Sequence, residues 1–376
     1  MMSSKVGQLF SIIILLLFLS SANAAPFAYI TNSGGGSVSV IDVATRVVVA
    51  TIPSGFGPSG VSVSPSGEFV YISSNDYFGV LNTDYSGAVF VIDSGTNSVV
   101  SRIRIGGGVN PYGIAVSPNG REIYVSNPGS NNLSIVDVAT RAEIATVAVG
   151  VNPQGVAFSP DGSKAYVTNY GNPYAFPQPI PGSISLIDVL SPSHPVTTIS
   201  IPSPPATPIG IALSPTGQYI YVADQANDSL LVFQSSNNTL VSSVPVGTSP
   251  DAVSVSPDGS IVYVTSNTGT LTAISSSSLQ VQNFISSNLQ VGVSVTSDGS
   301  EIYVANKSQG TISVLDARTF ASVATIPVGI GSAPLAFGNF ITPTPSSIPT
   351  LSEWTQIALA FMSFGLVFWY QRRESI

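Results

Sequence analysis

The residue types that most often carry catalysis are scarce in this chain. His194 is the only histidine, and there is no cysteine to serve as a nucleophile or metal ligand. A Ser–His–Asp triad needs a histidine held between a serine and a carboxylate. His194 instead follows Ser-Pro-Ser and precedes a proline, a composition that favours a turn. We therefore predict that His194 is a solvent-exposed turn residue and that the chain has no catalytic residue of this kind.

A recurring set of aspartates is the next candidate for chemistry. Each one ends a short apolar run: Asp42, Asp93, Asp137, Asp188 and Asp316. Several carboxylates held together would bind a hard cation, but this spacing places the aspartates in separate repeats. Asp also caps turns through its own side chain. We predict turn-capping roles for this set, with no metal site and no cofactor. The Gly106–Gly108 run precedes no helix, so we predict a loop there rather than a phosphate site.

One short turn divides the chain into repeats. Ser-Pro-Asp-Gly at residues 159–162 joins two apolar runs, and its Pro, Asp and Gly favour a hairpin. A Tyr-Ile or Tyr-Val pair begins the second run at seven positions: Tyr29, Tyr71, Tyr124, Tyr166, Tyr221, Tyr263 and Tyr303. Four strands in a unit of about 42 residues are typical of a β-propeller blade. We predict an all-β, seven-bladed propeller over residues 25–341, with six or eight blades as alternatives.

The second run carries a motif with a family resemblance. It stands as Tyr166-Val167-Thr168-Asn169, with variants at residues 29–32, 124–127 and 303–306. In this motif the chain resembles the YVTN β-propeller repeat proteins over about residues 26–341, a resemblance that implies the fold and says little about function. The first repeat lacks a leading strand, and residues 334–338 follow the last repeat. We predict that residues 334–338 pair beside residues 27–31, so that one blade contains both ends and the ring closes.

The two ends of the chain are predicted to direct export and sorting. Residues 1–24 have a basic start, an apolar centre and a small-residue Ala22-Asn23-Ala24 site, which is typical of a secretory signal peptide. A retained membrane anchor is the alternative. After a Pro/Thr/Ser linker at residues 342–347, residues 348–376 combine a motif, an apolar segment at about 355–370 and the pair Arg372-Arg373. This arrangement favours a transmembrane helix with a cytoplasmic tail.

The motif in this tail also has a family resemblance. Its residues are Ile348, Pro349, Thr350, Leu351 and Trp354. The segment resembles the IPTL-CTERM sorting signals of Gram-negative bacteria, although Thr355 replaces the glycine that usually follows the tryptophan. The resemblance implies signal peptidase and an exosortase-type protease as processing partners. It implies a protein that is exported across the inner membrane, is anchored by its C-terminal helix before processing, and is then periplasmic, cell-surface or extracellular.

A ring of residues is predicted at one mouth of the propeller channel. Each member follows the proline that connects two blades, or its equivalent: Ser59, Tyr112, Gln154, Ile209, Asp251, Val291 and Leu335. A metal-centred lactonase needs several convergent carboxylates or amides. Only Asp251 in this ring is acidic, and Gln154 is a weak additional ligand. The ring therefore argues against a catalytic metal centre.

Two long insertions are predicted to lie on the same face as this ring. The first, at residues 75–87, contains Tyr77, Phe78 and Tyr85, and the second, at residues 170–182, contains Tyr174 and Phe176. Extra loop length with aromatic side chains suits recognition of a sugar or a protein. Together with Tyr112, Gln154 and Asp251, these aromatic residues form our predicted binding surface. The alternative is that the loops only cover the blades.

Composition completes the sequence-based prediction. A net charge of −8 argues against a nucleic-acid partner. We predict a secreted or surface-anchored, non-catalytic propeller that binds a surface protein or glycan. Two alternatives remain open: a structural component of the cell surface or biofilm matrix, and a lactonase- or hydrolase-like propeller enzyme.

Overall fold

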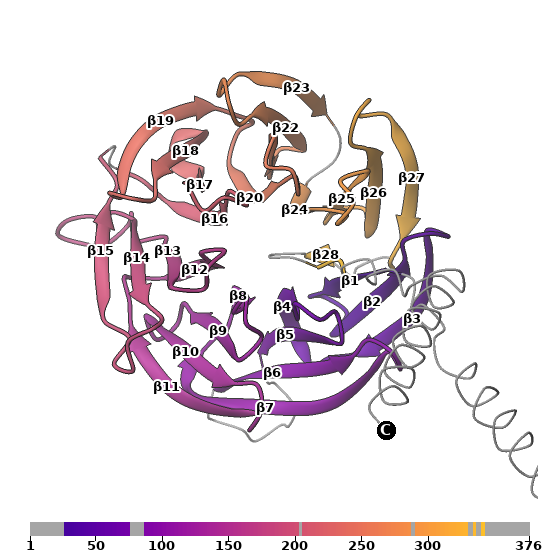
Figure 1. The fold of residues 1–376 in the computed structure, drawn as a ribbon, viewed down its shortest axis with the longest axis horizontal. Coiled ribbons are helices and arrows are strands. Elements are labelled where there is room, and N and C mark those ends of the chain that lie inside the picture. Colours follow the sequence, from indigo (N-terminus) through magenta and orange to yellow (C-terminus); the bar gives the residue numbers. More distant parts are fainter. Residues whose placement is uncertain are drawn as a thin grey trace, which may run out of the picture. The chain divides into compact units, whose positions relative to one another are not determined.

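The computed structural model describes residues 26–75, 86–202, 205–286, 290–329, 334–335 and 340–342. Within them, seven four-stranded antiparallel sheets follow one another around a ring (Figure 1). This confirms the all-β, seven-bladed propeller. The predicted signal peptide and the sorting signal with its apolar segment lie outside the described residues. Inside them, no helix is long and apolar enough to cross a bilayer.

Each blade contributes one strand to each of four concentric positions. The innermost strands are β4 (Phe56–Val63), β8 (Ile114–Val116), β12 (Pro153–Phe158), β16 (Pro208–Leu213), β20 (Pro250–Val255), β24 (Gln290–Val295) and β28 (Pro334–Leu335). The second strands are β1 (Phe27–Asn32), β5 (Phe69–Asn75), β9 (Glu122–Asn127), β13 (Lys164–Asn169), β17 (Tyr219–Asp224), β21 (Ile261–Ser266) and β25 (Glu301–Asn306). The third are β2 (Ser37–Asp42), β6 (Ser86–Asp93), β10 (Asn132–Asp137), β14 (Ser183–Asp188), β18 (Ser229–Gln234), β22 (Thr270–Ser275) and β26 (Thr311–Asp316). The outermost are β3 (Val47–Pro53), β7 (Ser98–Val109), β11 (Ala142–Ala148), β15 (Val196–Ser200), β19 (Thr239–Pro245), β23 (Val281–Ser286) and β27 (Ser322–Pro327), and a 3-10 turn, η1 (Gln225–Asn227), follows β17.

The repeated tyrosine and asparagine have structural roles in every intact copy of the motif. All seven tyrosines are at most 2% exposed and are therefore core residues. The asparagine bonds the next strand of its own blade: Asn169 donates through Nδ2 to Ser183 Oγ at 3.1 Å and to Ser185 Oγ at 3.0 Å. A fully buried amide of this kind fixes the register of the two strands, because a slipped register would leave it unpaired.

The hydroxyl residue of the motif joins neighbouring blades. Thr168 donates through Oγ1 to the carbonyl oxygen of Ile209, in the next blade, at 2.5 Å. The same hydroxyl accepts the backbone N–H of Gly155 at 2.9 Å. Equivalent bonds run from Thr31 to the carbonyl oxygen of Ser59 and from Ser126 to that of Gln154. These buried bonds set the spacing of the innermost strands and hence the dimensions of the channel.

The two ends of the domain meet in one blade, as predicted. Strand β28 pairs with β1 through Leu335 opposite Thr31 and Pro334 opposite Asn32. Further along, the backbone N–H of Tyr29 donates to the carbonyl oxygen of Phe340 at 2.8 Å. The N–H of Thr342 donates to the carbonyl oxygen of Phe27 at 2.9 Å, and Phe340 is fully buried. The ring is therefore closed by pairing of segments from opposite ends of the sequence.

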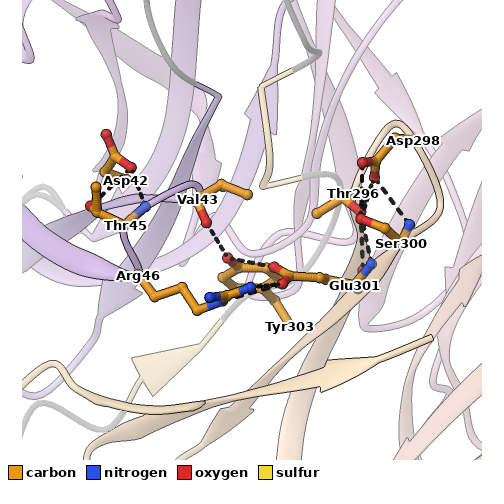
Figure 2. Close-up of polar contacts among 9 residues, drawn as sticks. All are labelled: Asp42, Val43, Thr45, Arg46, Thr296, Asp298, Ser300, Glu301 and Tyr303. Atoms are coloured by element: carbon orange, nitrogen blue, oxygen red, sulfur yellow. Dashed lines mark hydrogen bonds and ion pairs between the residues drawn. The ribbon is translucent and has the colours of Figure 1, made fainter. Parts of the chain in front are cut away.

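Side chains reinforce this closure on the opposite face of the ring from the β5–β6 and β13–β14 loops. Figure 2 shows Arg46, in the turn after β2, reaching Glu301 at the start of β25. The Arg46 Nε donates to Glu301 Oε1 at 3.2 Å, and Tyr303 donates through its hydroxyl to Glu301 Oε2 at 3.3 Å. Since β25 belongs to the last complete blade and β2 to the first, this ion pair joins the two blades at the seam.

The aspartates that end the third strands cap turns, as predicted. Asp42 Oδ1 accepts the backbone N–H of Thr45 at 2.7 Å, and Asp316 Oδ1 accepts that of Thr319 at 2.7 Å (Figure 2 shows the first). The Thr319 hydroxyl also donates to Asp316 Oδ1, at 2.7 Å, and the hydroxyl and backbone bonds together lower the pKa of the Asp316 carboxyl. Equivalent bonds involve Asp93, Asp137 and Asp188.

Two local predictions were wrong. His194 lies in the turn between β14 and β15, but it is only 9% exposed, because it packs edge-on against Tyr124 of the preceding blade, whose hydroxyl lies 3.3 Å from Nδ1. The Gly106–Gly108 run continues β7 instead of forming a loop. Close packing requires two of its glycines, since a Cβ on Gly107 would lie 2.5 Å from Thr146 Oγ1 and one on Gly108 would lie 2.3 Å from Asn127 Oδ1.

Candidate functional site

The predicted ring of connector residues surrounds one end of the channel. Glycines in the innermost strands bring the blades very close together here. A Cβ on Gly155 would lie 2.6 Å from the carbonyl oxygen of Ile209, and one on Gly210 would lie 2.3 Å from that of Asp251. The backbone carbonyl group of a ring residue in one blade thus packs against a glycine in the preceding blade. This packing holds the ring side chains on a rigid support.

Two polar members of the ring are turned toward their own loops. Gln154 donates through Nε2 to Asn152 Oδ1 at 2.8 Å, and Ser59 donates through Oγ to the carbonyl oxygen of Gly57 at 3.2 Å. Ile209 is buried, and the side chains of Val291 and Leu335 are not described. Gln154 is thus held by Asn152, and Asp251 is the acidic residue of the ring.

Asp251 is a carboxyl group that the fold has removed from water. It stands on β20 and is 5% exposed. Burial raises its pKa from 3.8 to about 7, a change that the positive charge of Lys307 partly opposes. Lys307 is exposed and lies in the loop between β25 and β26, on the neighbouring blade. Asp251 is therefore poised to exchange a proton near neutral pH, as a general base must.

Tyr112 interacts electrostatically with Asp251. It lies in the connection from β7 to β8 and packs against the core cluster that includes Ile209 and Ala252. Burial raises the pKa of the Tyr112 hydroxyl well above its usual value, and the negative charge of Asp251 raises it further. Two complete blades separate β8 from β20, so these groups can influence each other only across the central axis (Figure 1). Tyr112 thus remains a protonated hydrogen-bond donor at neutral pH.

A resident metal does not fit this site. Among the described residues, no three histidine, aspartate or glutamate side chains converge in a way that could hold a metal ion. Calcium or magnesium would need several oxygen ligands around it. Asp251 is instead the single ring carboxylate, with a phenol and a cation nearby. The arrangement is that of an acid–base group with two electrostatic partners.

The predicted aromatic loop residues are only partly described. Tyr174 and Phe176 stand in the β13–β14 loop and are 91% and 96% exposed. This loop and the β5–β6 loop both connect second to third strands, as predicted. Tyr77, Phe78 and Tyr85 lie outside the described residues, as do the sorting-signal residues Ile348 to Trp354, Arg372 and Arg373. A role of the aromatic loop residues in recognition stays a prediction.

Sequence reasoning identified Asp251 and Tyr112 but missed two features. It gave no indication that Asp251 is buried. It also passed over Lys307, which follows the Tyr303–Asn306 copy of the repeated motif. Lys307 begins a loop between a second and a third strand, and such loops were predicted to lie on the same face as the connector ring. The sequence could therefore have indicated that Lys307 is near this face.

Comparison with known proteins adds a family match. Residues 139–268 match the model of a family described as "Lactonase, 7-bladed beta-propeller". A protein of Bacillus subtilis, YwhL, described as uncharacterized, is 24% identical over 321 residues, covering 64% of this chain and 67% of the relative. A protein of the Mycobacterium tuberculosis PE-PGRS family is 57% identical over 37 residues, and this match spans only 10% of the chain and 8% of that relative.

Solved structures share the same fold. The periplasmic gluconolactonase PpgL of Pseudomonas aeruginosa superposes with a TM-score of 0.66 at 17% identity, covering 85% of this chain and all of that one. A Bacteroides uniformis protein assigned as a 6-phosphogluconolactonase gives a TM-score of 0.65 at 16% identity, covering 82% and 98% of the two chains. At these identities, the likeness establishes the fold.

The family match overturns two of our predictions, namely that the protein is a non-catalytic binding module and that it is not an enzyme. The matched model is that of an enzyme family, and lactonases are among the structural neighbours. These findings favour the lactonase-like alternative. The earlier reasoning failed because a shortage of carboxylates excludes only a metal-centred mechanism. A single buried carboxylate suffices for general base catalysis.

Proposed function

We propose that this protein is a lactonase-like hydrolase that opens a cyclic ester at the channel mouth, with Asp251 as its general base. The observation that carries the proposal is the burial of this carboxylate in the ring. Burying a charged carboxylate destabilises a fold, so a buried Asp251 that interacts electrostatically with Tyr112 and Lys307 calls for a functional reason. The family match over residues 139–268 supports the same reaction class.

The site residues account for each proton in this reaction. The Asp251 carboxylate removes a proton from a water molecule as the water oxygen attacks the lactone carbonyl carbon. Negative charge then develops on the carbonyl oxygen, where a Tyr112 hydrogen bond and the Lys307 charge stabilise it. When the ring C–O bond breaks, the Asp251 carboxylic acid returns the proton to the departing oxygen. The product is a hydroxy acid, and Asp251 is again ionised.

Ring opening releases acid and can be followed by pH-stat titration. The substrates are γ-butyrolactone, γ-dodecalactone and glucono-δ-lactone, tested on residues 25–343 with and without a chelator. We expect Asp251→Asn to lower kcat by at least 100-fold, because a positioned general base contributes about 10²–10⁴-fold. Activity of the unaltered protein should rise with pH through about 7, as Asp251 ionises. Unchanged activity in Asp251→Asn, or no hydrolysis of any lactone, would refute the proposal.

We further propose that the chain is a YVTN-type propeller that is exported and processed at both ends. The signal-like residues 1–24 and the IPTL-CTERM-like residues 348–376 support this proposal. Intact-mass analysis of the cell-associated and secreted protein tests it. The mature chain should begin near Ala25 and lack the segment after Trp354, and Leu351→Ala with Trp354→Ala should retain that segment. A secreted protein that keeps Arg372 and Arg373 would contradict tail removal.

A further inference from the structure

The channel below Asp251 widens into an apolar funnel on the opposite face of the ring. This funnel has a volume of about 520 Å³ and is lined by the lower halves of the innermost strands and by the prolines of the repeated turns. Its apolar side chains include Phe158, Leu213 and Val255. The described lining contains no charged residue and no amide or imidazole side chain.

A narrow cavity, here called the throat, adjoins the funnel at the level of the residues that follow the ring positions. The throat has a volume of about 40 Å³ and includes Gly155, Gly210 and Ala252, the last of which directly follows Asp251. Val156, Ile211 and Val253 are among the residues that line both spaces. From Asp251 to Val255 the β20 backbone rises by roughly 13 Å. The throat and the funnel therefore share their lining, and the throat begins at the residue next to Asp251 on β20.

The polar groups of the funnel are mostly engaged within the protein. Ser64 Oγ accepts the backbone N–H of Phe69 at 3.0 Å, and Ser256 Oγ accepts that of Ile261 at 3.0 Å. Ser62 Oγ accepts the N–H of Val116 at 3.1 Å. A sugar lactone placed here would lose water from its hydroxyl groups with little compensation, which is unfavourable. A hydrocarbon chain would lose only its contact with water, which is favourable.

We propose that the substrate of this site is a lactone that carries a hydrocarbon chain, with the lactone ring at Asp251 and the chain passing through the throat into the funnel. This inference rests on the proposed lactonase function and goes beyond it by assigning the substrate class. The small volume of the throat suits a hydrocarbon chain better than a second ring. The funnel then acts as a specificity site for chain length.

Chain length provides the first test. Each fully buried methylene group is worth about 0.8 kcal/mol, which is about fourfold in binding. We expect the KM of the unaltered protein for γ-dodecalactone to be at least 50-fold lower than for γ-butyrolactone, with glucono-δ-lactone the poorest of the three. Ile211→Trp fills the junction of throat and funnel, so the ratio of kcat/KM for the long and short lactones should fall to about one. Val241→Trp, on the exposed face of β19, is the matched control and should keep the ratio.

A binding measurement separates this inference from the proposed function. In the Asp251→Asn variant, 1-decanol should displace the fluorescent apolar probe N-phenyl-1-naphthylamine. In the double variant Asp251→Asn/Ile211→Trp, 1-decanol should not displace the probe. If both lactones are hydrolysed with equal KM and 1-decanol displaces nothing, the funnel inference fails while the lactonase function stands. If 1-decanol displaces the probe but no lactone is hydrolysed, the lactonase function fails and the substrate assignment with it.

Discussion

At the scale of single residues, Asp251 shows how far sequence can lead toward a site. Its chain position after a connector proline identified it as the acidic member of the ring. The property on which its proposed role depends, a pKa near neutrality, comes from burial in the folded protein. No local pattern around Asp251 encodes that burial. Residue type and approximate location were therefore predictable, whereas acid–base behaviour was not.

The buried Asp251 carboxyl should also leave a mark on stability. Its pKa is about 7 in the folded protein and 3.8 when exposed, so folding favours the protonated form. Its favourable contribution is complete below about pH 4 and is lost as the pH rises through about 7. Asp251→Asn stays neutral throughout and should therefore be more stable than the unaltered protein at pH 8, by up to about 4 kcal/mol. Urea unfolding between pH 4 and pH 8 measures this difference.

An exposed aspartate supplies the control for this prediction. Asp316 caps its turn with a hydrogen bond from Thr319, which lowers its pKa. Its contribution is present at neutral pH and is lost as the pH falls through the lowered pKa. Asp316→Asn should therefore give no gain at pH 8. A stability difference for Asp251→Asn that does not grow with pH would mean that the carboxyl remains hydrated.

At the scale of elements, the repeat made most of the architecture predictable. In the Tyr166–Asn169 motif, the tyrosine is a buried aromatic side chain, the threonine makes a hydrogen bond between blades and the asparagine makes one between strands. The variants elsewhere repeat these roles. Errors arose where one copy departs from the repeat. Gly106–Gly108 resembles a loop in isolation but extends β7, and Asn127 leaves no space for a side chain at Gly108. His194 is buried by Tyr124 of another blade, a contact that its own turn could not reveal.

The same comparison explains why the function was mispredicted while the fold was not. Strand pairing depends on patterns that recur every few residues and can be counted. The channel depends on side chains that meet only once, after seven sheets have closed around an axis. The funnel is an example, since Val156, Ile211 and Val253 come from three blades and look like ordinary core positions in sequence. The apolar funnel and the ring that contains the acidic Asp251 form only when all seven blades have closed around the axis.

At the scale of the whole molecule, the channel exists only if the two ends of the domain remain paired. A chain that ends at Gly329 would lose β28 and the Phe340–Thr342 segment, and it would expose Ala28, Tyr29 and Ile30, which are now fully buried. Losing the buried Phe340 alone costs about 3–5 kcal/mol. We expect the melting temperature to fall by roughly 10 °C or more, with loss of lactone hydrolysis, as measured by calorimetry and pH-stat titration.

The matched control for this truncation is a chain that ends at Thr342. It lacks the predicted sorting signal but keeps every closing contact, including the hydrogen bond between Thr342 and Phe27. It should therefore have the same melting temperature as the untruncated protein. The Arg46–Glu301 ion pair spans the same seam through side chains, so both truncated chains retain it. Equal melting temperatures for the two truncated chains would show that this ion pair and the remaining contacts between blades hold the ring closed without strand pairing. The closing strand would then be dispensable.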